Sequence, residues 1–244
     1  MIIDAKDLDF KELNQKIRDG GPDILIKDCL GQRFIAAGTD GKHIQIKGIP
    51  GNALGAYLNG SEIEVLGNAQ DAVGDTMNAG KIIIHGNIGD AAGYAMRGGE
   101  IYVKGTAGYR AGIHMKEYKN ESTVKMPVMV IGGGAGSFLG EYQAGGIIAV
   151  LGLELKPGKD IVSNFPCTGM HGGKMYLRSD CKGIRFPGQV GAHTASDSEK
   201  YEIEKYISQF CSHFGYSAGE ILDAPFTVVT PDSKNPYKQM YVAN

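Results

Sequence analysis

Apolar residues in the first half of the chain repeat with a period of nineteen. Two β-branched positions, separated by one residue, recur as Ile44, Ile63, Ile82, Ile101 and as Ile46, Val65, Ile84, Val103. This alternation is typical of a β-strand with one buried face. Two further apolar columns are Leu58, Met77, Met96, Met115 and Leu54, Val73, Ala92, Ala111. The pattern predicts one strand-containing unit that is repeated and stacked.

Glycine and charge follow the same period. Glycine recurs in two registers, at Gly48, Gly67, Gly86, Gly105 and at Gly55, Gly74, Gly93, Gly112. Such a unit must turn sharply several times, and glycine permits both positive φ and close approach of neighbouring units. Stacking places equivalent residues about 4.8 Å apart, so Glu62, Lys81 and Glu100 are expected to attract one another across strands. Asp71 and Asp90 share a turn column and are expected to repel.

These columns predict an all-β fold, a single-stranded parallel β-helix of about 19 residues per coil. Six or seven coils fit between residues 23 and 187. A glycine-rich barrel with coincidental spacing is the alternative, and the number of columns in register disfavours it.

The period is interrupted twice, and each end of the stack needs a cover. Residues 128–132 repeat the pattern of 101–105 after 27 positions, eight more than the period, so the polar run 116–122 is an expected loop. A second insertion lies around 155–164. Helical patterns at 9–17 and 198–210 are expected to form short helical end caps. The predicted divisions are an N-terminal helical cap over 1–22, the β-helix over 23–190, and a C-terminal helix and tail over 191–244, all in one domain.

Composition limits the class of protein. The chain has 244 residues, 42% of them apolar, which is enough for a packed core. A net charge of −2 argues against a nucleic-acid footprint across the whole surface. The four cysteines form no Cys-x-x-Cys pair, and no apolar stretch is long enough to span a membrane. We expect a cytoplasmic protein with free thiols that binds neither nucleic acid nor membrane.

Two segments contain residues of types that occur in cofactor-binding, metal-binding or catalytic sites. Residues 128–136 follow a strand pattern and are rich in glycine, but the third glycine of a dinucleotide-binding Gly-x-Gly-x-x-Gly is replaced by Ser137 or Leu139. Cys167 and His171, with Cys181 and His193 nearby in sequence, lack a third ligand or an orienting carboxylate at a recognisable spacing. We interpret these segments as a turn of the repeat, and as a buried thiol with a turn histidine.

Two repeat positions also invite a catalytic interpretation. His85 shares its column with Lys47, Leu66 and Lys104, which marks a surface position. Asp71 and Asp90 resemble the paired carboxylates of a glycosidase, but their common column favours stacked turn residues. The sequence therefore predicts no catalytic, cofactor-binding or metal-binding residue.

The coil pattern resembles the GXGXG β-helix family. The resemblance is carried by residues 86–93, 132–136 and especially 167–178, Cys-Thr-Gly-Met-His-Gly-Gly-Lys-Met-Tyr-Leu-Arg. The last segment is similar to the Gly-Met-His-Gly-Gly signature in the C-terminal domain of the glutamate synthase large subunit. Residues 221–231 and Tyr237–Lys238 are similar to the end of that polypeptide. The resemblance covers about residues 23–240.

This resemblance implies a right-handed, structural β-helix that packs between a glutamine amidotransferase and a synthase that contains FMN and iron–sulfur clusters. Position 2 is Ile2, so the N-terminal cysteine nucleophile of glutamine hydrolysis is missing, as is an iron–sulfur cysteine cluster. The implied protein is an assembly subunit of a split glutamate synthase. It would bind no cofactor itself and would associate with amidotransferase and FMN-binding synthase subunits. Association into a homo-oligomer is left open.

Other interpretations of the repeat remain open. The same family includes the β-helical scaffold of formylmethanofuran dehydrogenase, although the tail after Ile221 favours the glutamate synthase type. Acyltransferases on left-handed β-helices repeat every 18 residues, but the six-residue sub-period with its aliphatic positions is absent. The insertions at 115–127 and 153–170 and the two end covers are the expected partner surfaces.

Overall fold

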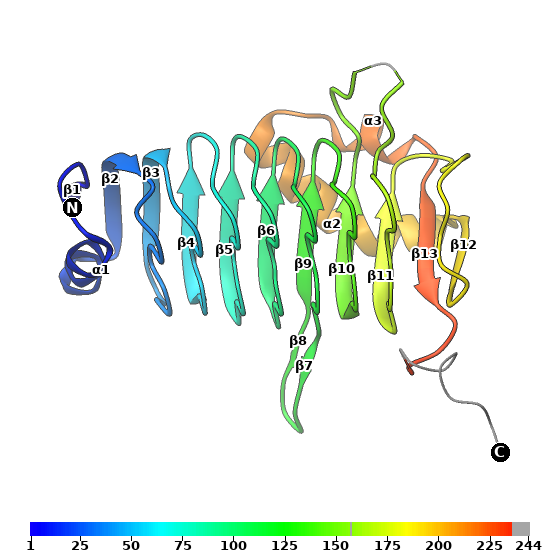
Figure 1. Cartoon of the computed structure of the whole chain (residues 1–244), viewed down its shortest axis with the longest axis horizontal. Coiled ribbons are helices and arrows are strands. Elements are labelled where there is room, and N and C mark those ends of the chain that lie inside the picture. The colour runs from blue at the N-terminus through cyan, green and yellow to red at the C-terminus, as the bar shows by residue number, and fades with distance from the viewer. Residues whose placement is uncertain (157, 236–244) are drawn as a thin grey trace.

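The computed structural model describes residues 1–156 and 158–235. Its main feature is a sheet whose parallel strands stack in chain order and whose connections close a cylinder (Figure 1). The parallel strands are β1 (Ile2–Asp4), β2 (Asp23–Leu30), β3 (His43–Ile49), β4 (Asn59–Val65), β5 (Ala79–Ile84), β6 (Gly99–Val103), β9 (Pro127–Ile131), β10 (Ala144–Val150) and β11 (Gly172–Leu177).

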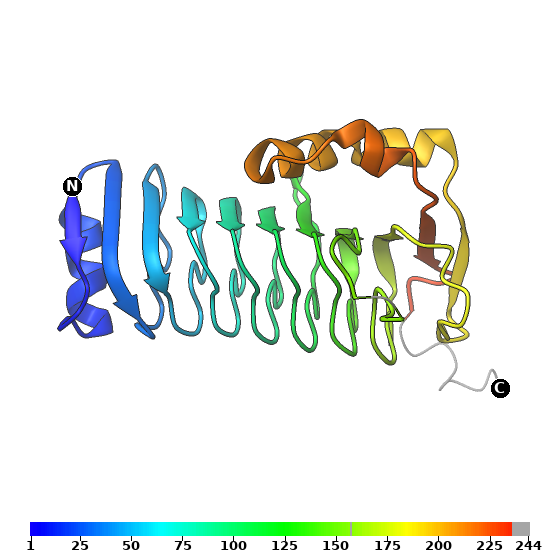
Figure 2. The ribbon, with the colours of Figure 1, turned by 90° about the horizontal axis from the view of Figure 1, so that it is seen from above.

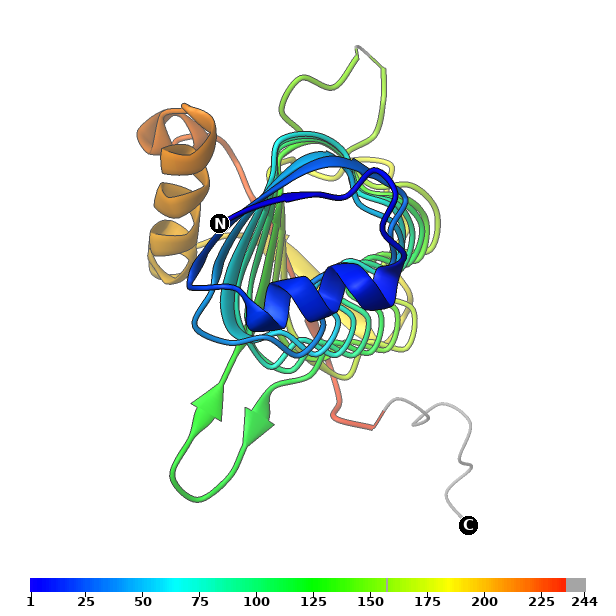
Figure 3. The same cartoon turned by 90° about the vertical axis from the view of Figure 1, so that its left-hand side faces the viewer.

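The predicted parallel β-helix is thus confirmed. The eight strands β2 to β11 of this wall bound seven complete coils, in agreement with the six or seven expected. Seen from the N-terminal end, the chain turns clockwise as it recedes, so the helix is right-handed (Figure 3).

The strand columns lie in the expected register. Ile63 pairs with Ile44 and Ile82, and Val65 with Ile46 and Ile84. The columns continue through Met129 and Ile131 of β9 and Ile148 and Val150 of β10. All are buried in one apolar cluster that extends from Ile3 to Val229. The columns of Leu58 and Leu54 fill the same core from the opposite wall.

Glycine shapes the turns in two different ways. Gly112 has a φ of +71°, and a Cβ there would meet Ile148 Cδ1 in the core. Gly105 instead leaves room for a neighbouring polar side chain, because a Cβ there would meet Asn87 Oδ1. Non-glycine residues also adopt positive φ at the outer turns, in the column Ala53, Ala72, Ala91, Arg110, Phe138, Phe165. The sequence pattern did not indicate these left-handed positions.

The Asp71–Asp90 column does more than place like charges together. Asp71 Oδ1 accepts the backbone N–H of Asp90 at 2.9 Å, and Asp90 Oδ1 accepts that of Tyr109 at 2.8 Å. Asn68 and Asn87 form a matching ladder, accepting from the N–H groups of Asn87 and Thr106 at 2.8 Å. Each side chain therefore ties its coil to the next, which the expectation of simple repulsion missed.

The two ends are closed differently. Helix α1 (Phe10–Asp19) begins at Asp9, whose side chain accepts from the N–H groups of Lys11 and Glu12, and it packs on the first coil as expected (Figure 3). At the other end, β13 (Thr227–Pro231) pairs antiparallel with β11, and β12 (Val190–Thr194) pairs antiparallel with β13. Two strands, rather than a helix, extend the sheet at this end.

Helix α2 (Asp197–Phe214) is not the end cap that was expected. It lies along the outer face of the strand wall, and the short helix α3 (Ala218–Leu222) follows it (Figure 2). The reason is an apolar column on the outside of the wall: Ile83, Tyr102, Val130, Ala149 and Tyr176. On β3 and β4 the equivalent positions are Gln45 and Glu64, which need no apolar cover.

The first insertion forms a two-stranded hairpin, β7 (Tyr118–Lys119) and β8 (Val124–Lys125), which projects from the cylinder (Figure 1). The second insertion, between β10 and β11, projects at the opposite edge. The Tyr237–Lys238 pair of the tail lies outside the described residues.

Candidate functional site

The glycine-rich segment after β9 is a turn of the repeat and not a nucleotide loop. Gly132 lies directly over the carbonyl of Lys104, and Gly133 over Thr106 and Gly105 of the preceding coil. The next regular element is the strand β10, so no helix N-terminus faces this loop. A dinucleotide-binding fingerprint requires that helix.

Cys167 and His171 do not form a catalytic pair. Cys167 occupies the turn position of Gly112 and Gly140, with a φ of +61°, and its Sγ lies 3.5 Å from Met175 Sδ in the core. Burial raises the pKa of the Cys167 thiol, which keeps it protonated. His171 Nδ1 instead lies 2.9 Å from the carbonyl oxygen of Gly169. All four cysteines are free and buried.

Among residues 1–156 and 158–235, no cluster of three or more His, Cys, Asp or Glu side chains is arranged to hold a metal ion. In the same part of the chain, the helices are too short or too polar to cross a lipid bilayer.

A group of ionisable side chains lies where α2 ends. It contains His85, which the sequence analysis assigned to a surface position, and Glu64 and His213, which the sequence analysis did not single out. Glu64 Oε1 is 2.8 Å from His85 Nε2, and Gln45 donates to Glu64 Oε2 at 2.8 Å. The ring of Phe214 packs edge-on against His85, with centroids 5.2 Å apart. Burial lowers the pKa of neighbouring His213, with a smaller contribution from Lys81. Phe214 thus attaches the C-terminal end of α2 to His85, directly after β5, and His85 is in turn held by Glu64 of β4, so His85 has a structural role.

The middle of α2 is held by a buried ring. Phe210 is fully buried and lies against Gly132, whose missing side chain makes room for it. Near the start of the helix, Glu202 accepts from Tyr176 Oη at 2.9 Å and pairs with Lys174. Burial and the Glu202 carboxylate raise the pKa of Tyr176, so its hydroxyl stays a donor.

Two rows of rings run along the outer turns of the later coils. His114 stacks on Tyr142 with centroids 5.2 Å apart and planes 7° apart. In the second row, Phe138 lies 5.4 Å from Tyr109 and 5.2 Å from Phe165. The guanidinium of Arg110 lies 4.8 Å from the Tyr109 ring centroid, and its Nε is 2.7 Å from Glu141 Oε2. Exposed aromatic rings with arginine are typical of protein interfaces.

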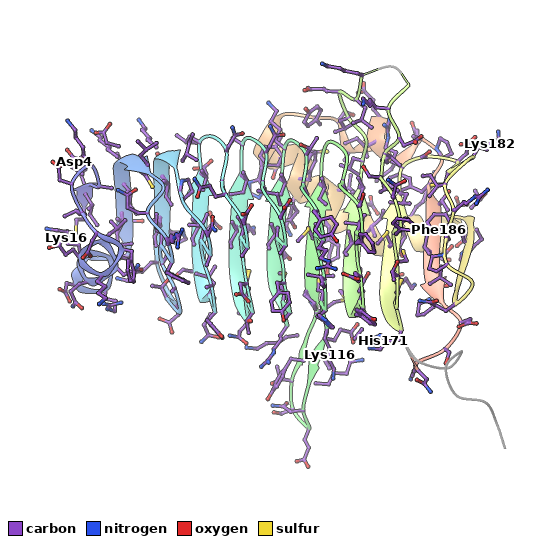
Figure 4. The ribbon with its side chains drawn as sticks, in the orientation of Figure 1. Asp4, Lys16, Lys116, His171, Lys182 and Phe186 are labelled. Atoms are coloured by element: carbon purple, nitrogen blue, oxygen red, sulfur yellow. The ribbon has the colours of Figure 1, made fainter. Side chains whose placement is uncertain are left out.

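A groove of about 800 Å³ lies beside these rings, between the root of the β7–β8 hairpin and residues 231–234. The small residues among its lining are Ala144, Gly145, Gly172 and Gly173. Lys116 and His171 line it and lie at the same edge of the cylinder (Figure 4). The groove therefore combines the first insertion with the Gly-Met-His-Gly-Gly segment. The sequence analysis named both segments but did not indicate that they meet.

The fold and its surfaces define a class of protein: a parallel β-helix with rows of aromatic rings along its outer turns. Comparison with known proteins specifies the family. The model of the GXGXG motif family matches residues 23–232, and the chain belongs to that family.

Two known proteins are similar to this chain over most of its length. The chain is 44% identical to the uncharacterized protein MJ1350 of Methanocaldococcus jannaschii, over 99% of this chain and 96% of that one. Among solved structures, a chain of the formyltransferase/hydrolase complex of Methylorubrum extorquens, determined with methylofuran, matches with a TM-score of 0.62. The identity is 21%, over 86% of this chain and 73% of that chain, so the likeness concerns the fold.

Proposed function

We propose that this chain is a non-catalytic assembly subunit of a split glutamate synthase. It packs a glutamine amidotransferase subunit and an FMN- and iron–sulfur-containing synthase subunit for glutamate biosynthesis in the cytoplasm. The chemistry and the cofactors belong to those partners, and this chain binds neither FMN nor a cluster.

One observation carries the proposal: the two segments most similar to the glutamate synthase large subunit form a single structural unit. Strand β11, from the signature segment, pairs with β13, from the tail, through Met175 and Val229. Arg178 of the signature donates to the carbonyl of Ile221 at 3.3 Å, and Thr227 donates to that of Ser179 at 2.7 Å. Membership of the GXGXG family supports the same role.

Isolation of the native assembly tests the proposal. The chain would carry an affinity tag in its own cell and be purified at moderate salt. We expect retention of an FMN-containing polypeptide and an amidotransferase, together with glutamine-dependent formation of glutamate from 2-oxoglutarate. Purification without a flavoprotein and without this activity would contradict the proposal.

A second candidate is a scaffold in a complex that transfers or hydrolyses formyl groups, because the solved structure with a similar fold comes from such a complex. The same purification separates the two. Retained formyltransferase activity, with no glutamate formed, would favour the second candidate.

A further inference from the structure

The sheet of the β-helix ends at the free edge of β12 (Val190–Thr194). This strand pairs with β13 on one side, and no helix or strand lies beyond it in the described parts of the chain, 1–156 and 158–235 (Figure 1). Four of its five residues, Gly191 to Thr194, are exposed. An exposed strand edge pairs readily with another chain unless charged residues, proline or a covering element prevent it.

The backbone of β12 has unused hydrogen-bonding groups along this edge. Ala195 donates its N–H to the carbonyl of Phe226 at 2.8 Å. In an antiparallel pair, the residues that bond to one neighbour alternate along the strand, so the N–H and C=O groups of Ala192 and Thr194 point away from β13. Among the described residues, neither N–H has a hydrogen-bond partner. The edge therefore presents free donors and acceptors to a second chain.

Gly191, in the interior of β12, is a glycine that this chain alone does not require. Its φ is outside the left-handed region, and a Cβ there would meet no atom within 4 Å. Gly105 and Gly112 of the coils differ, because a Cβ at either would meet an atom of the same chain. Glycine weakens a strand interior and often marks the close approach of another backbone. The open space beside Gly191 therefore suits a second chain.

The same strand leaves apolar surface uncovered at the end of the core. Ala192 lies directly opposite Val229 of β13, so the two side chains share the inward face of the wall. Val229 is fully buried in the main apolar cluster, whereas Ala192 is exposed. Ile184 and Phe186 of the preceding loop are only partly buried against that cluster. A chain beside β12 would cover apolar surface as well as satisfy backbone groups.

The opposite edge of the sheet, at β1, is protected against pairing. Ala5 donates to the Lys27 carbonyl at 2.9 Å, so by the same alternation Asp4 faces the free edge (Figure 4). A carboxylate there opposes pairing with another strand. β12 contains no Asp, Glu, Lys, Arg or Pro, and the only ionisable side chain in it, His193, lies 2.9 Å from Glu199. The two edges therefore differ, and the β12 edge is the one open to a second strand.

From these observations we infer that β12 pairs with β12 of a second copy of this chain, antiparallel about a two-fold axis at Ala192. In this register, the N–H of Ala192 meets the carbonyl of Ala192 in the second copy, and that of Thr194 meets the carbonyl of Val190. His193 lies beside Gly191 of the second copy, which has no side chain to obstruct it. An axis at His193 would instead place two histidine rings opposite each other.

The second copy is the occupant that this edge fits, because a two-fold pair uses the same groups on both chains and closes. Pairing of β12 with β1 of a further copy would build an open filament and bring Asp4 into the contact. The inference goes beyond the proposed assembly role and does not depend on the identity of any other subunit.

The mass of the purified chain in solution tests the inference. Light scattering after size-exclusion chromatography, over a series of concentrations, should give a mass that rises toward twice that of one chain. The mass of a single chain at every concentration would overturn the inference.

Variants locate the contact. Ala192→Pro removes an N–H that the chain itself does not use, so the bonds between β12 and β13 stay in place. It should weaken the dimer about tenfold, because two-fold symmetry removes the hydrogen bond twice. Gly191→Val should weaken it as well, by filling the space for His193. Ala192→Ser keeps the N–H and is the matched control. Circular dichroism verifies folding, and a dimer unaffected by Ala192→Pro would overturn the inference.

A cross-link tests the register and the occupant together. Directly opposite residues of a hydrogen-bonded antiparallel pair have Cα atoms about 5.5 Å apart, a distance that a disulfide bridges. Ala192→Cys should therefore form a disulfide-linked dimer under mild oxidation, since the four native cysteines are buried. Lys16→Cys, on α1 at the other end, should not (Figure 4). A disulfide formed in the cell between Ala192→Cys and a different polypeptide would assign the edge to a partner and overturn the inference.

Discussion

At the scale of single residues, the coils are held in register by side chains that bond to the backbone of the next coil. Asp71, Asp90, Asn68 and Asn87 each accept a backbone N–H of the following coil. Glycine at positions such as Gly105 is required because this neighbouring oxygen occupies the space of a Cβ. The glycine period and the Asn/Asp period are thus two parts of one arrangement.

Substitutions of Asp90 test whether its hydrogen bond or its charge determines its effect on stability. Asp90→Ala removes the acceptor for the Tyr109 N–H and should lower the free energy of unfolding by about 0.5–1.5 kcal/mol. Asp90→Asn keeps an acceptor oxygen and removes the repulsion from Asp71, so it should be neutral or slightly stabilising. Urea unfolding measures both variants. Equal losses in the two would show that the charge, rather than the hydrogen bond, matters.

Substitution of Gly112 tests how much of the cost of a side chain at a positive-φ turn comes from core packing and how much from backbone conformation. Gly112→Ala places a Cβ against Ile148 Cδ1 at a φ of +71° and should cost about 2–5 kcal/mol. Gly41 has a φ of +60° with open space around it, so Gly41→Ala should cost only about 1–2 kcal/mol. Urea unfolding of the two variants is the measurement. A similar cost at both sites would exclude core overpacking as the cause.

At the scale of elements, the strand wall was predictable and the position of α2 was not. The sequence predicted a helix at 198–210, but the pattern of an amphipathic helix does not indicate which surface the helix covers. A usable signal lay in the strands themselves. Ile83, Tyr102 and Val130 are apolar at outward positions, where β3 and β4 have Gln45 and Glu64. The hairpin groove was not predictable, because its parts come from coils and a tail that only the fold brings together.

The attachment of α2 should depend on pH. Burial lowers the pKa of His213 from its ordinary value of 6.5, so the folded protein binds this proton less readily than the unfolded chain. Stability is therefore complete above about pH 6.5 and declines as the pH falls below it. Melting temperatures between pH 7.5 and 5.5 measure this decline.

His213→Gln is the matched control for that titration. It cannot gain a proton, so its melting temperature should fall less over the same range. The range lies well above the pKa of Glu199, which hydrogen bonds from Ser196 hold at about 2, so the capping box of α2 stays intact. An identical pH dependence in wild type and variant would rule out His213 as the cause.

At the scale of the whole molecule, the β-helix is covered unevenly. α2 packs on outer residues from Ile83 of β5 to Tyr176 of β11, whereas the outer faces of β2 to β4 have no helix over them (Figure 2). In a stacked fold, each coil contacts only its neighbours, so local stability follows local cover. The N-terminal coils should be the first to open.

Amide hydrogen exchange tests this gradient. We expect the slowest exchange in β5 to β10 and faster exchange in β2 and β3, because opening near the uncovered end breaks fewer contacts. Ile26 and Ile148, both buried on inward-facing strand positions, are suitable reporters. Uniform protection along the stack would mean that the β-helix opens only as a whole.

Because the coils are evenly spaced, they set fixed distances between surfaces along the axis of the molecule. Each coil adds about 4.8 Å along the axis, and both insertions project outside the cylinder while the inward columns continue, from Ile101 to Met129 and from Ile148 to Met175 (Figure 1). Duplicating one 19-residue coil between β4 and β5 would move the N-terminal end away from the hairpin by that one increment. Any proteins bound at these two places would be respaced in fixed steps, while the surfaces that contact them stayed the same.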